Sequence, residues 1–263
     1  MNHTIITCES LIKKITRTDT LFNGQYCIDP YQNCEIGCLY CDSSFDHTIY
    51  IKHNAAEILE KELPNLQKGV IIIGSVHDPY QKAELKYELT KKILQSIKKH
   101  QFPCHILTKS THILRDINLL TQIDCTVTIS ISSTDEKVAK IFEQNVPSPL
   151  NRLQTIKTLT DHNIKTGLAL IPILPYITET SLEDIVQQAK NHNARYILHK
   201  HLELKGEQKQ QFISIITKSY PDLKSAYTTM YKNRILPDEK HISLIEKKLQ
   251  HYCKQYHIPN KIN

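Results

Sequence analysis

Three cysteines, Cys34, Cys38 and Cys41, lie within eight residues in the pattern Cys-x3-Cys-x2-Cys. Thiolates this close together bind soft metals. A structural zinc site usually takes four ligands, often as two cysteine pairs. The sequence has no second pair, and the nearest spare ligands, His47 and His53, complete no usual zinc spacing. Three thiolates without a fourth suit a cubane iron–sulfur cluster with one open iron, which is a reaction site and not only a structural one.

The other five cysteines have no such spacing. Cys104 and Cys125 lie in apolar stretches, where a free cysteine packs like a small hydrophobic residue. Cys8, Cys27 and Cys253 are interpreted as structural or incidental. We therefore expect only the three clustered cysteines to bind metal.

Composition bounds the class of protein. The chain has 263 residues, a net charge of +6, 40% hydrophobic and 23% charged residues. These values exclude a disordered, collagen-like or coiled-coil chain. No apolar run of membrane-spanning length occurs, and residues 1–14 do not resemble a secretory signal, so we expect a cytoplasmic protein with reduced thiols and no membrane partner. The dispersed positive charge permits a polyanionic partner without requiring one.

Short apolar runs alternate with amphipathic stretches along residues 25–202. This order is typical of βα units that form a parallel sheet. In the clearest amphipathic stretch, 85–100, residues Leu85, Leu89, Ile93 and Ile97 fall at helical spacing. Thr180 and Ser181 are predicted to cap the helix that follows them. The predicted strands are 25–30, 70–76, 103–109, 125–132, 165–174 and 195–202. The predicted helices are 55–63, 85–100, 112–121, 148–162, 180–192, 206–219 and 238–256.

Six βα units are too few for a closed eight-stranded barrel. The predicted fold is α/β, a partial (β/α)6 TIM-like barrel, with a doubly wound sheet as the alternative arrangement. The barrel is assigned to residues 21–204, after an N-terminal extension (1–20) and before a helical C-terminal appendage (205–263). Both folds place functional groups at the carboxyl ends of the strands. The polar residues predicted there are Ser75, His77, Asp78, Thr108, Lys109, Ser130, Ser132, His199 and His201.

The cysteine motif, with the aromatic Tyr40 before its last cysteine, resembles the signature of radical S-adenosylmethionine (radical SAM) enzymes. The resemblance implies a [4Fe–4S] cluster whose open iron chelates the amino and carboxylate groups of S-adenosylmethionine. An electron, supplied by a donor such as flavodoxin or ferredoxin, then cleaves it to methionine and a 5′-deoxyadenosyl radical that abstracts hydrogen from substrate. The family fold is a partial (β/α)6 barrel, and Tyr40 would pack near the adenine.

Further motifs resemble the spore photoproduct lyase branch, whose members are often described as DNA repair photolyase-like. The resemblance covers about residues 21–204 and makes nucleic acid a possible partner. Two alternatives stay open: a radical SAM enzyme acting on a peptide, a tRNA or a small metabolite, and a non-enzymatic zinc or redox-sensing protein. The motifs are Asp78-Pro-Tyr-Gln81 with Glu84, Leu107-Thr-Lys-Ser110, Ile129-Ser-Ile-Ser132 and Pro147-Ser-Pro-Leu-Asn-Arg152.

The resemblance also assigns cofactor-binding residues. Lys109 would face the carboxylate or the ribose of S-adenosylmethionine, and Ser130 and Ser132, on one face of their strand, would hydrogen-bond the ribose or methionine group. Ser75 and His77, which follow Gly74, would lie where the backbone meets the amino group.

Other polar residues carry weaker expectations. Asp78 either joins the cofactor site or only shapes the turn before Pro79. Arg152 is expected in an ion pair or a helix cap. His199 and His201 alternate along the last strand and are expected to face the barrel interior.

One departure concerns the reaction. In the lyase, a cysteine at the end of the second strand donates a hydrogen atom to the product radical. Ser75 stands at about that place here, and no cysteine occurs between Cys41 and Cys104. Because a hydroxyl O–H bond is much stronger than a thiol S–H bond, we expect no strict spore photoproduct lyase reaction.

Overall fold

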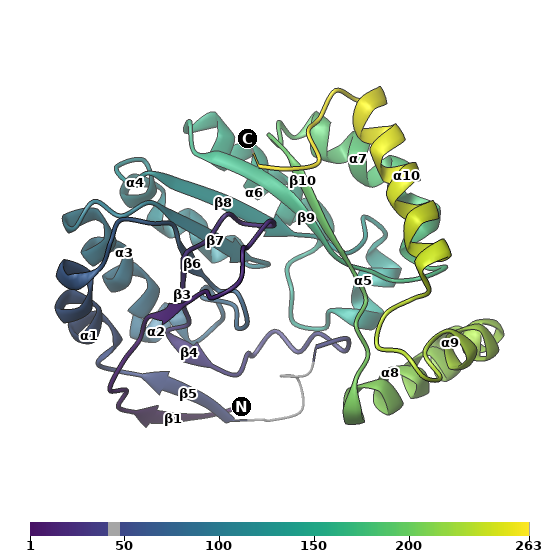
Figure 1. The fold of residues 1–263 in the computed structure, drawn as a ribbon, viewed down its shortest axis with the longest axis horizontal. Helices are drawn as coiled ribbons and strands as arrows, with labels where there is room; N and C mark the ends of the chain where they lie inside the picture. Colours follow the sequence, from purple (N-terminus) through teal and green to yellow (C-terminus); the bar gives the residue numbers. More distant parts are fainter. Residues whose placement is uncertain (42–47, 263) are drawn as a thin grey trace.

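A seven-stranded sheet forms the centre of the computed structural model, which describes residues 1–41 and 48–262. Its strand order is β10-β9-β8-β7-β6-β3-β2 (Figure 1). Strands β3 to β10 of this sheet run parallel, and β2 adds an antiparallel edge. All six predicted strands are confirmed. The bounds are β2 Lys13–Lys14, β3 Tyr26–Ile28, β6 Ile71–Ile73, β7 Cys104–Thr108, β8 Cys125–Ser130, β9 Lys165–Ile173 and β10 Ile197–His201.

Helices cover the outer face of this sheet. Those of the βα units are α1 Ala55–Glu62, α2 Glu84–Tyr87, α3 Leu89–Lys99, α4 Ile117–Leu120, α5 Glu136–Phe142, α6 Pro149–Asp161 and α7 Leu182–Asn191. The 3-10 turns are η2 Leu63–Asn65, η3 Thr111–Asp116, η4 Thr178–Ser181 and η5 Pro221–Leu223. Three further helices, α8 Gly206–Ser219, α9 Lys224–Met230 and α10 Glu239–Gln255, follow the last strand. Of these, α8 and α9 pack together, whereas α10 packs beside α7 (Figure 1).

Two hydrophobic clusters show that the sheet is curved. The larger cluster joins outward-facing residues of the strands to buried residues of the surrounding helices. A smaller cluster joins Ile72 of β6, Ala169 of β9 and Leu198 of β10, which are not all neighbours in the sheet. These inward-facing side chains meet because the sheet curls around them, as in an open barrel. The structure thus confirms the α/β, partial TIM-like fold.

The predicted single helix over 85–100 is wrong, because the chain breaks at Glu88. This residue has a φ of 50° and separates α2 from α3. The buried carboxylate of Glu84 accepts the N–H groups of Thr90 and Lys91 at 2.9 and 3.2 Å. Since that carboxylate satisfies the free N–H groups of the second helix, the first helix ends there. Leu85 is consequently exposed and is not part of the buried face.

The predicted cap of the helix after residue 180 is also wrong. The Ser181 side chain makes no capping bond to α7. Instead, Thr180 and Ser181 donate their hydroxyls backwards, to the carbonyls of Ile177 and Thr178. Both side chains thus hydrogen-bond within the η4 turn, which precedes α7.

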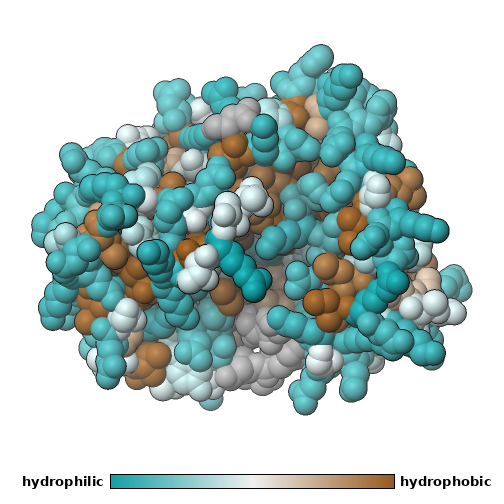
Figure 2. Space-filling model, in the orientation of Figure 1, coloured by the Kyte–Doolittle hydropathy of each residue, from teal (hydrophilic) through white to brown (hydrophobic). Residues whose placement is uncertain are grey.

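A second, small sheet was not predicted. Its strands β1 (Asn2–Ile6), β5 (Thr48–Lys52) and β4 (Tyr31–Gln32) lie in the order β1-β5-β4. The pattern was missed because β1 is mostly exposed and β4 has only two residues. The helices α5 and α9 are short and were also missed. In the part of the chain described, no helix has both the length and the apolar character to cross a bilayer. Hydrophobic residues are scattered among hydrophilic ones on the face seen in Figure 2.

Candidate active site

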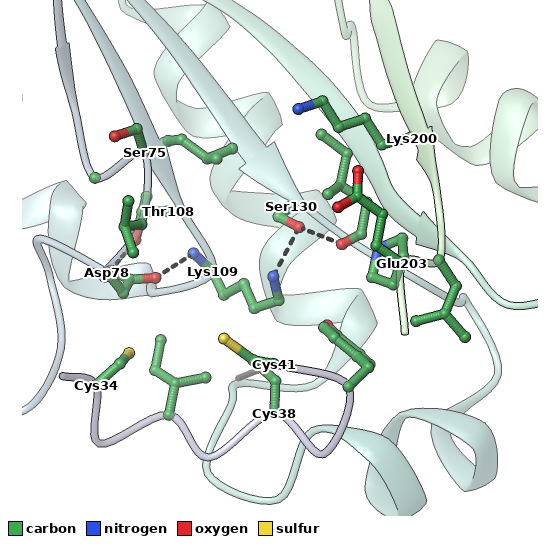
Figure 3. Close-up of a pocket in the computed structure, with 18 of the residues that line it drawn as sticks. Cys34, Cys38, Cys41, Ser75, Asp78, Thr108, Lys109, Ser130, Lys200 and Glu203 are labelled. Carbon is green, nitrogen blue, oxygen red and sulfur yellow. Dashed lines mark hydrogen bonds between the residues drawn. The ribbon is translucent and has the colours of Figure 1, made fainter. Parts of the chain in front are cut away.

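A cavity of about 360 Å³ opens at the carboxyl ends of the parallel strands. This volume lies in the usual range of small-molecule sites. One wall of the cavity comes from the cysteine loop and the ends of β6, β7 and β8. The opposite wall comes from residues 200–208, around the end of β10 and the start of α8 (Figure 3).

Cys34, Cys38 and Cys41 all line this cavity and lie along one loop beneath the side chain of Lys109 (Figure 3). Gln81 holds the loop in place: its side-chain oxygen accepts the Glu35 N–H at 2.9 Å, and its amide donates to the Asn33 carbonyl at 3.1 Å. The Glu35 carboxylate in turn accepts the Ala83 N–H at 2.6 Å. The Asp78–Gln81 motif therefore positions the cysteines.

The chemistry of these donors fits an iron–sulfur cluster. Burial raises the pKa of Cys38 to about 12 and raises the pKa of Cys34 further. Both groups are therefore neutral thiols near pH 7 when no metal is bound, and metal binding must release their protons. All three cysteines line one cavity, and three thiols on one loop match the donor set of a cluster with one open iron.

Gly74 and Asp78 shape the turn that follows β6. Gly74 has a φ of +85°, and a Cβ there would lie 2.6 Å from the Leu107 carbonyl, so no larger residue fits. The buried Asp78 carboxylate accepts the Lys109 N–H at 2.7 Å and the Thr108 hydroxyl at 2.6 Å. Asp78 therefore does more than shape its own turn, because it ties the β6 loop to the end of β7.

Lys109 and Ser130 meet in the cavity, as the sequence led us to expect for neighbours at strand ends. Lys109 Nζ donates to Ser130 Oγ at 2.9 Å and lies 5.7 Å from the centre of the Tyr40 ring. Burial lowers the pKa of Lys109, but interactions with the acidic groups of Cys38 and Glu143, of which only Glu143 is charged at neutral pH, outweigh that effect and raise its pKa overall. Lys109 is therefore a partly buried cation that faces the cysteine loop.

Behind Lys109 lies a buried ion pair between Arg152 and Glu143, of which only Arg152 was predicted from the sequence. Arg152 Nη2 donates to Glu143 at 2.6 Å, and both side chains are essentially inaccessible to solvent. The same carboxylate accepts the hydroxyls of Tyr40 and Ser132, and Arg152 also donates to the Ser130 carbonyl at 2.8 Å. The expectation of an ion pair for Arg152 is confirmed. Glu143 was missed because it directly follows the unpredicted helix α5. Only the need of a buried arginine for an acidic partner could have indicated it.

The predicted cofactor-binding residues fall into two groups. Tyr40, Ser75, Lys109 and Ser130 line the cavity, whereas His77 and Ser132 are not among its lining residues. Ser132 supports Glu143 from behind. The backbone N–H of His77 faces the Asp29 carboxylate at 3.3 Å.

Cys27, which the sequence gave no reason to single out, lies in the barrel interior. It belongs to the same inward-facing cluster as Ile72 and Ala169. Its thiol hydrogen-bonds the Ser75 side chain, and burial raises its pKa. Ser75 lines the cavity but Cys27 does not, so the serine separates the Cys27 thiol from the cavity.

The opposite wall carries charged groups from the end of β10. Lys200 and Glu203 line the cavity (Figure 3), and neither side chain has a hydrogen bond or ion pair with any residue that the structure describes. Gln208 of α8 donates its amide to the Tyr40 carbonyl and so joins the two walls. The interior position on β10 is held by Leu198. The expectation that His199 faces the interior is therefore wrong, because successive residues of a strand point to opposite faces; His199 lies toward α10 instead.

Comparison with known proteins agrees with this geometry. The sequence profile of the radical SAM superfamily matches residues 28–189. An uncharacterized protein of Methanocaldococcus jannaschii is 29% identical over 230 residues, covering 84% of this chain and 86% of that protein. An uncharacterized protein of Mycobacterium tuberculosis is 26% identical over 248 residues, covering 86% of this chain and 73% of that protein.

Among solved structures, a spore photoproduct lyase variant with bound AdoMet and dinucleoside spore photoproduct has the same fold. The TM-score is 0.74 at 14% sequence identity, and the match covers 97% of this chain and 79% of that chain. At 14% sequence identity, this similarity establishes a shared fold and nothing further.

Proposed function

The chain belongs to the radical SAM superfamily, and from that premise we propose that it is a [4Fe–4S] enzyme of spore photoproduct lyase-like type that acts on nucleic acid. The observation that carries the proposal is that three thiols and a partly buried cation line one cavity. The superfamily implies S-adenosylmethionine and an iron–sulfur cluster. When bound, the cluster supplies the electron that cleaves S-adenosylmethionine reductively, and the resulting 5′-deoxyadenosyl radical abstracts hydrogen from substrate.

The residues of the chain divide the remaining work. Cys34, Cys38 and Cys41 would hold the cluster. Lys109 would attract the carboxylate or ribose of S-adenosylmethionine, and Ser130, which accepts from Lys109, would fix the direction of that cation. Tyr40 would pack near the adenine. His77 and Ser132 stay predictions as cofactor ligands, with Ser132 better placed to support Glu143.

Three observations favour nucleic acid as the substrate. The related fold of spore photoproduct lyase holds a dinucleoside, the chain has a net charge of +6, and Lys200 lines the wall opposite the cysteines. A cation at the mouth of a cavity suits a phosphate. Because the cluster needs reduced thiols and a supply of electrons, we place the enzyme in the cytoplasm with a donor such as flavodoxin or ferredoxin.

The test of this proposal uses anaerobically reconstituted, dithionite-reduced enzyme and S-adenosylmethionine. Mass spectrometry should detect 5′-deoxyadenosine from the wild type and none from a Cys38→Ala variant. Addition of deuterated DNA or RNA should transfer deuterium to 5′-deoxyadenosine if nucleic acid is the substrate. A colourless protein that holds one zinc and makes no 5′-deoxyadenosine would contradict the proposal and favour the non-enzymatic alternative.

The same assay addresses repair of DNA. We expect the wild type not to restore thymines in irradiated DNA that contains spore photoproduct, because Ser75 lines the cavity where a thiol would be needed and the Cys27 thiol does not line it. Ser75→Cys would place a thiol on the cavity and should increase restoration. Clean catalytic repair by the wild type, lost in Cys27→Ala, would show that the thiol of Cys27 reaches the product radical and that this expectation is wrong.

A further inference from the structure

At the border of the cavity, two histidines of β10 and one glutamate of α10 form a cluster that the proposed chemistry does not use. His199, His201 and Glu246 each offer one ligand atom, and these atoms all lie within 4.8 Å of one another. The His199 Nε2 atom is 4.0 Å from a Glu246 carboxylate oxygen. The two imidazole rings lie 6.0 Å apart, centre to centre, and are nearly perpendicular.

The fold brings these residues together by packing α10 against the outer side of β10 (Figure 1). Ile197 begins the strand in the same hydrophobic cluster as Ile245 and Leu249 of the helix. Glu246 follows Ile245 and therefore lies at the rim of the buried stripe of α10. A register shift between His199 and His201 bends the end of the strand. All three side chains are partly buried.

Hydrogen bonds between the three side chains do not explain why they lie together. A separation of 4.0 Å between His199 and Glu246 is too long for a hydrogen bond. The Nε2 atom of His201 is buried and has no hydrogen-bond partner among the residues described. A buried imidazole nitrogen without a hydrogen-bond partner needs an explanation. With a second imidazole and a carboxylate beside it, the three groups form a typical set of metal ligands.

We propose that His199, His201 and Glu246 bind one divalent transition-metal ion such as zinc, at a site separate from the three cysteines. Two imidazole nitrogens and a carboxylate oxygen are a common ligand set for zinc, at about 2.0–2.2 Å from the ion. Two ligands of one tetrahedral ion then lie about 3.4 Å apart, so the ligand atoms must close by about 0.6 Å between His199 and Glu246 and by no more than about 1.4 Å for any other pair. The half-exposed Glu246 side chain leaves room for that movement.

The site would link the C-terminal helix to the cavity. His201 also lines the cavity that contains the cysteines, while Glu246 lies on α10. Three protein ligands leave at least one coordination position for water or for an anionic group of a ligand. A metal ion here would hold α10 to the end of β10 and place positive charge at the border of the cavity. The proposal does not depend on the reaction assigned above.

The test uses the holoenzyme with its cysteines already occupied by the reconstituted cluster. The protein is dialysed anaerobically against micromolar zinc chloride, desalted and analysed for zinc and iron. The wild type should retain about one zinc per chain beyond the cluster iron. Glu246→Gln and His201→Ala should lose that zinc and keep their iron. His251→Ala, which removes an exposed histidine of the same helix, should bind zinc like the wild type.

Thermal unfolding gives a second measurement. Added zinc should raise the melting temperature of the wild type and of His251→Ala, but not that of Glu246→Gln. Because the Glu246 side chain is half-exposed, its conservative replacement preserves folding even if a histidine variant does not. Failure of the wild type to retain zinc, or equal zinc content in Glu246→Gln and wild type, would overturn the proposal and leave His199 and Glu246 as a loose ion pair.

Discussion

The two walls of the cavity differ in how completely their polar groups are bonded. On the wall formed by the cysteine loop and β6 to β8, Asp78, Lys109 and Glu143 each contact several fixed partners. On the wall formed by residues 200–208, the charged ends of Lys200 and Glu203 have no bonded partner within residues 1–41 and 48–262. The first wall is rigid before any ligand arrives, whereas the second can turn its charges toward what enters.

This difference indicates how the work is divided. A fully bonded polar network holds its members in one geometry, which suits groups that serve the same cofactor in every cycle. Lys200 and Glu203 are exposed, so water occupies their hydrogen-bonding positions until a ligand replaces it. We therefore assign the first wall to the cluster and S-adenosylmethionine and the second wall to the substrate. The predictions below test that division.

Loss of a cysteine should have the largest effect. Replacement of Cys34, Cys38 or Cys41 by alanine removes one of three ligands, so both iron content and 5′-deoxyadenosine formation should be abolished. Elemental analysis and mass spectrometry measure the two quantities. Cys253→Ala is the control, because Cys253 is buried in the helix-facing core far from the cavity. If that variant lost its iron while a loop variant kept it, the assignment of the ligands would be wrong.

The buried ion pair should contribute most to the stability of the first wall. Glu143→Gln leaves Arg152 and Lys109 without their shared anion, and breaking a buried pair from one side typically costs about 3–5 kcal/mol of unfolding free energy. Chemical denaturation measures this loss. Glu136→Gln on the same helix breaks an exposed pair with Lys140, which should cost less than about 0.5 kcal/mol. Equal losses in the two variants would show that the network does not stiffen the wall.

Lys109 should matter for cofactor affinity. Lys109→Met removes a charge-assisted hydrogen bond, worth about 1.5–3 kcal/mol, or roughly ten- to a hundredfold in S-adenosylmethionine affinity. Iron content should stay unchanged, because Lys109 is not a ligand. Equilibrium binding of S-adenosylmethionine measures the effect, with Lys99→Ala, an exposed cation, as the control. Unchanged affinity in Lys109→Met would remove the cation from the cofactor site.

The second wall should give the smallest and most selective effect. Lys200→Ala should leave S-adenosylmethionine affinity unchanged but weaken nucleic-acid binding and lower the slope of log affinity against log salt by about one. The matched control is Lys224→Ala, an exposed cation on α9. A decrease in S-adenosylmethionine affinity as large as that of Lys109→Met would break the division between the walls.

The strands were predictable from the sequence because their signal is local. Val70–Ile73 is a short apolar run, which is typical of a strand buried on both faces, and Cys125–Ile131 alternates apolar and hydroxyl residues with the period of a strand. The same order placed Lys109 and Ser130 at neighbouring strand ends, and the structure shows them in contact.

The helix break at Glu88 and the partner of Arg152 could not be predicted in this way. Helix α2 is short because the carboxylate of its first residue, Glu84, binds Arg115 and the backbone N–H of Thr90. Periodicity carries no information about such contacts. Glu143 meets Tyr40, which lies 103 residues earlier in the chain. The tertiary fold decides which buried charges come into contact. The contacts of Glu143 behind the first wall could therefore be identified only from the structure.

The hydrogen bond from Gln208 to the Tyr40 carbonyl joins residues 168 positions apart, and this separation has a consequence for biosynthesis. A ribosome makes the cysteine loop early and the wall of residues 200–208 late. The loop can therefore meet donors of iron and sulfur while the nascent chain still lacks the helix that will cover Tyr40. A chain that ended near residue 204 would retain Cys34, Cys38, Cys41 and Lys109 but would leave that side of the loop open to water and oxygen.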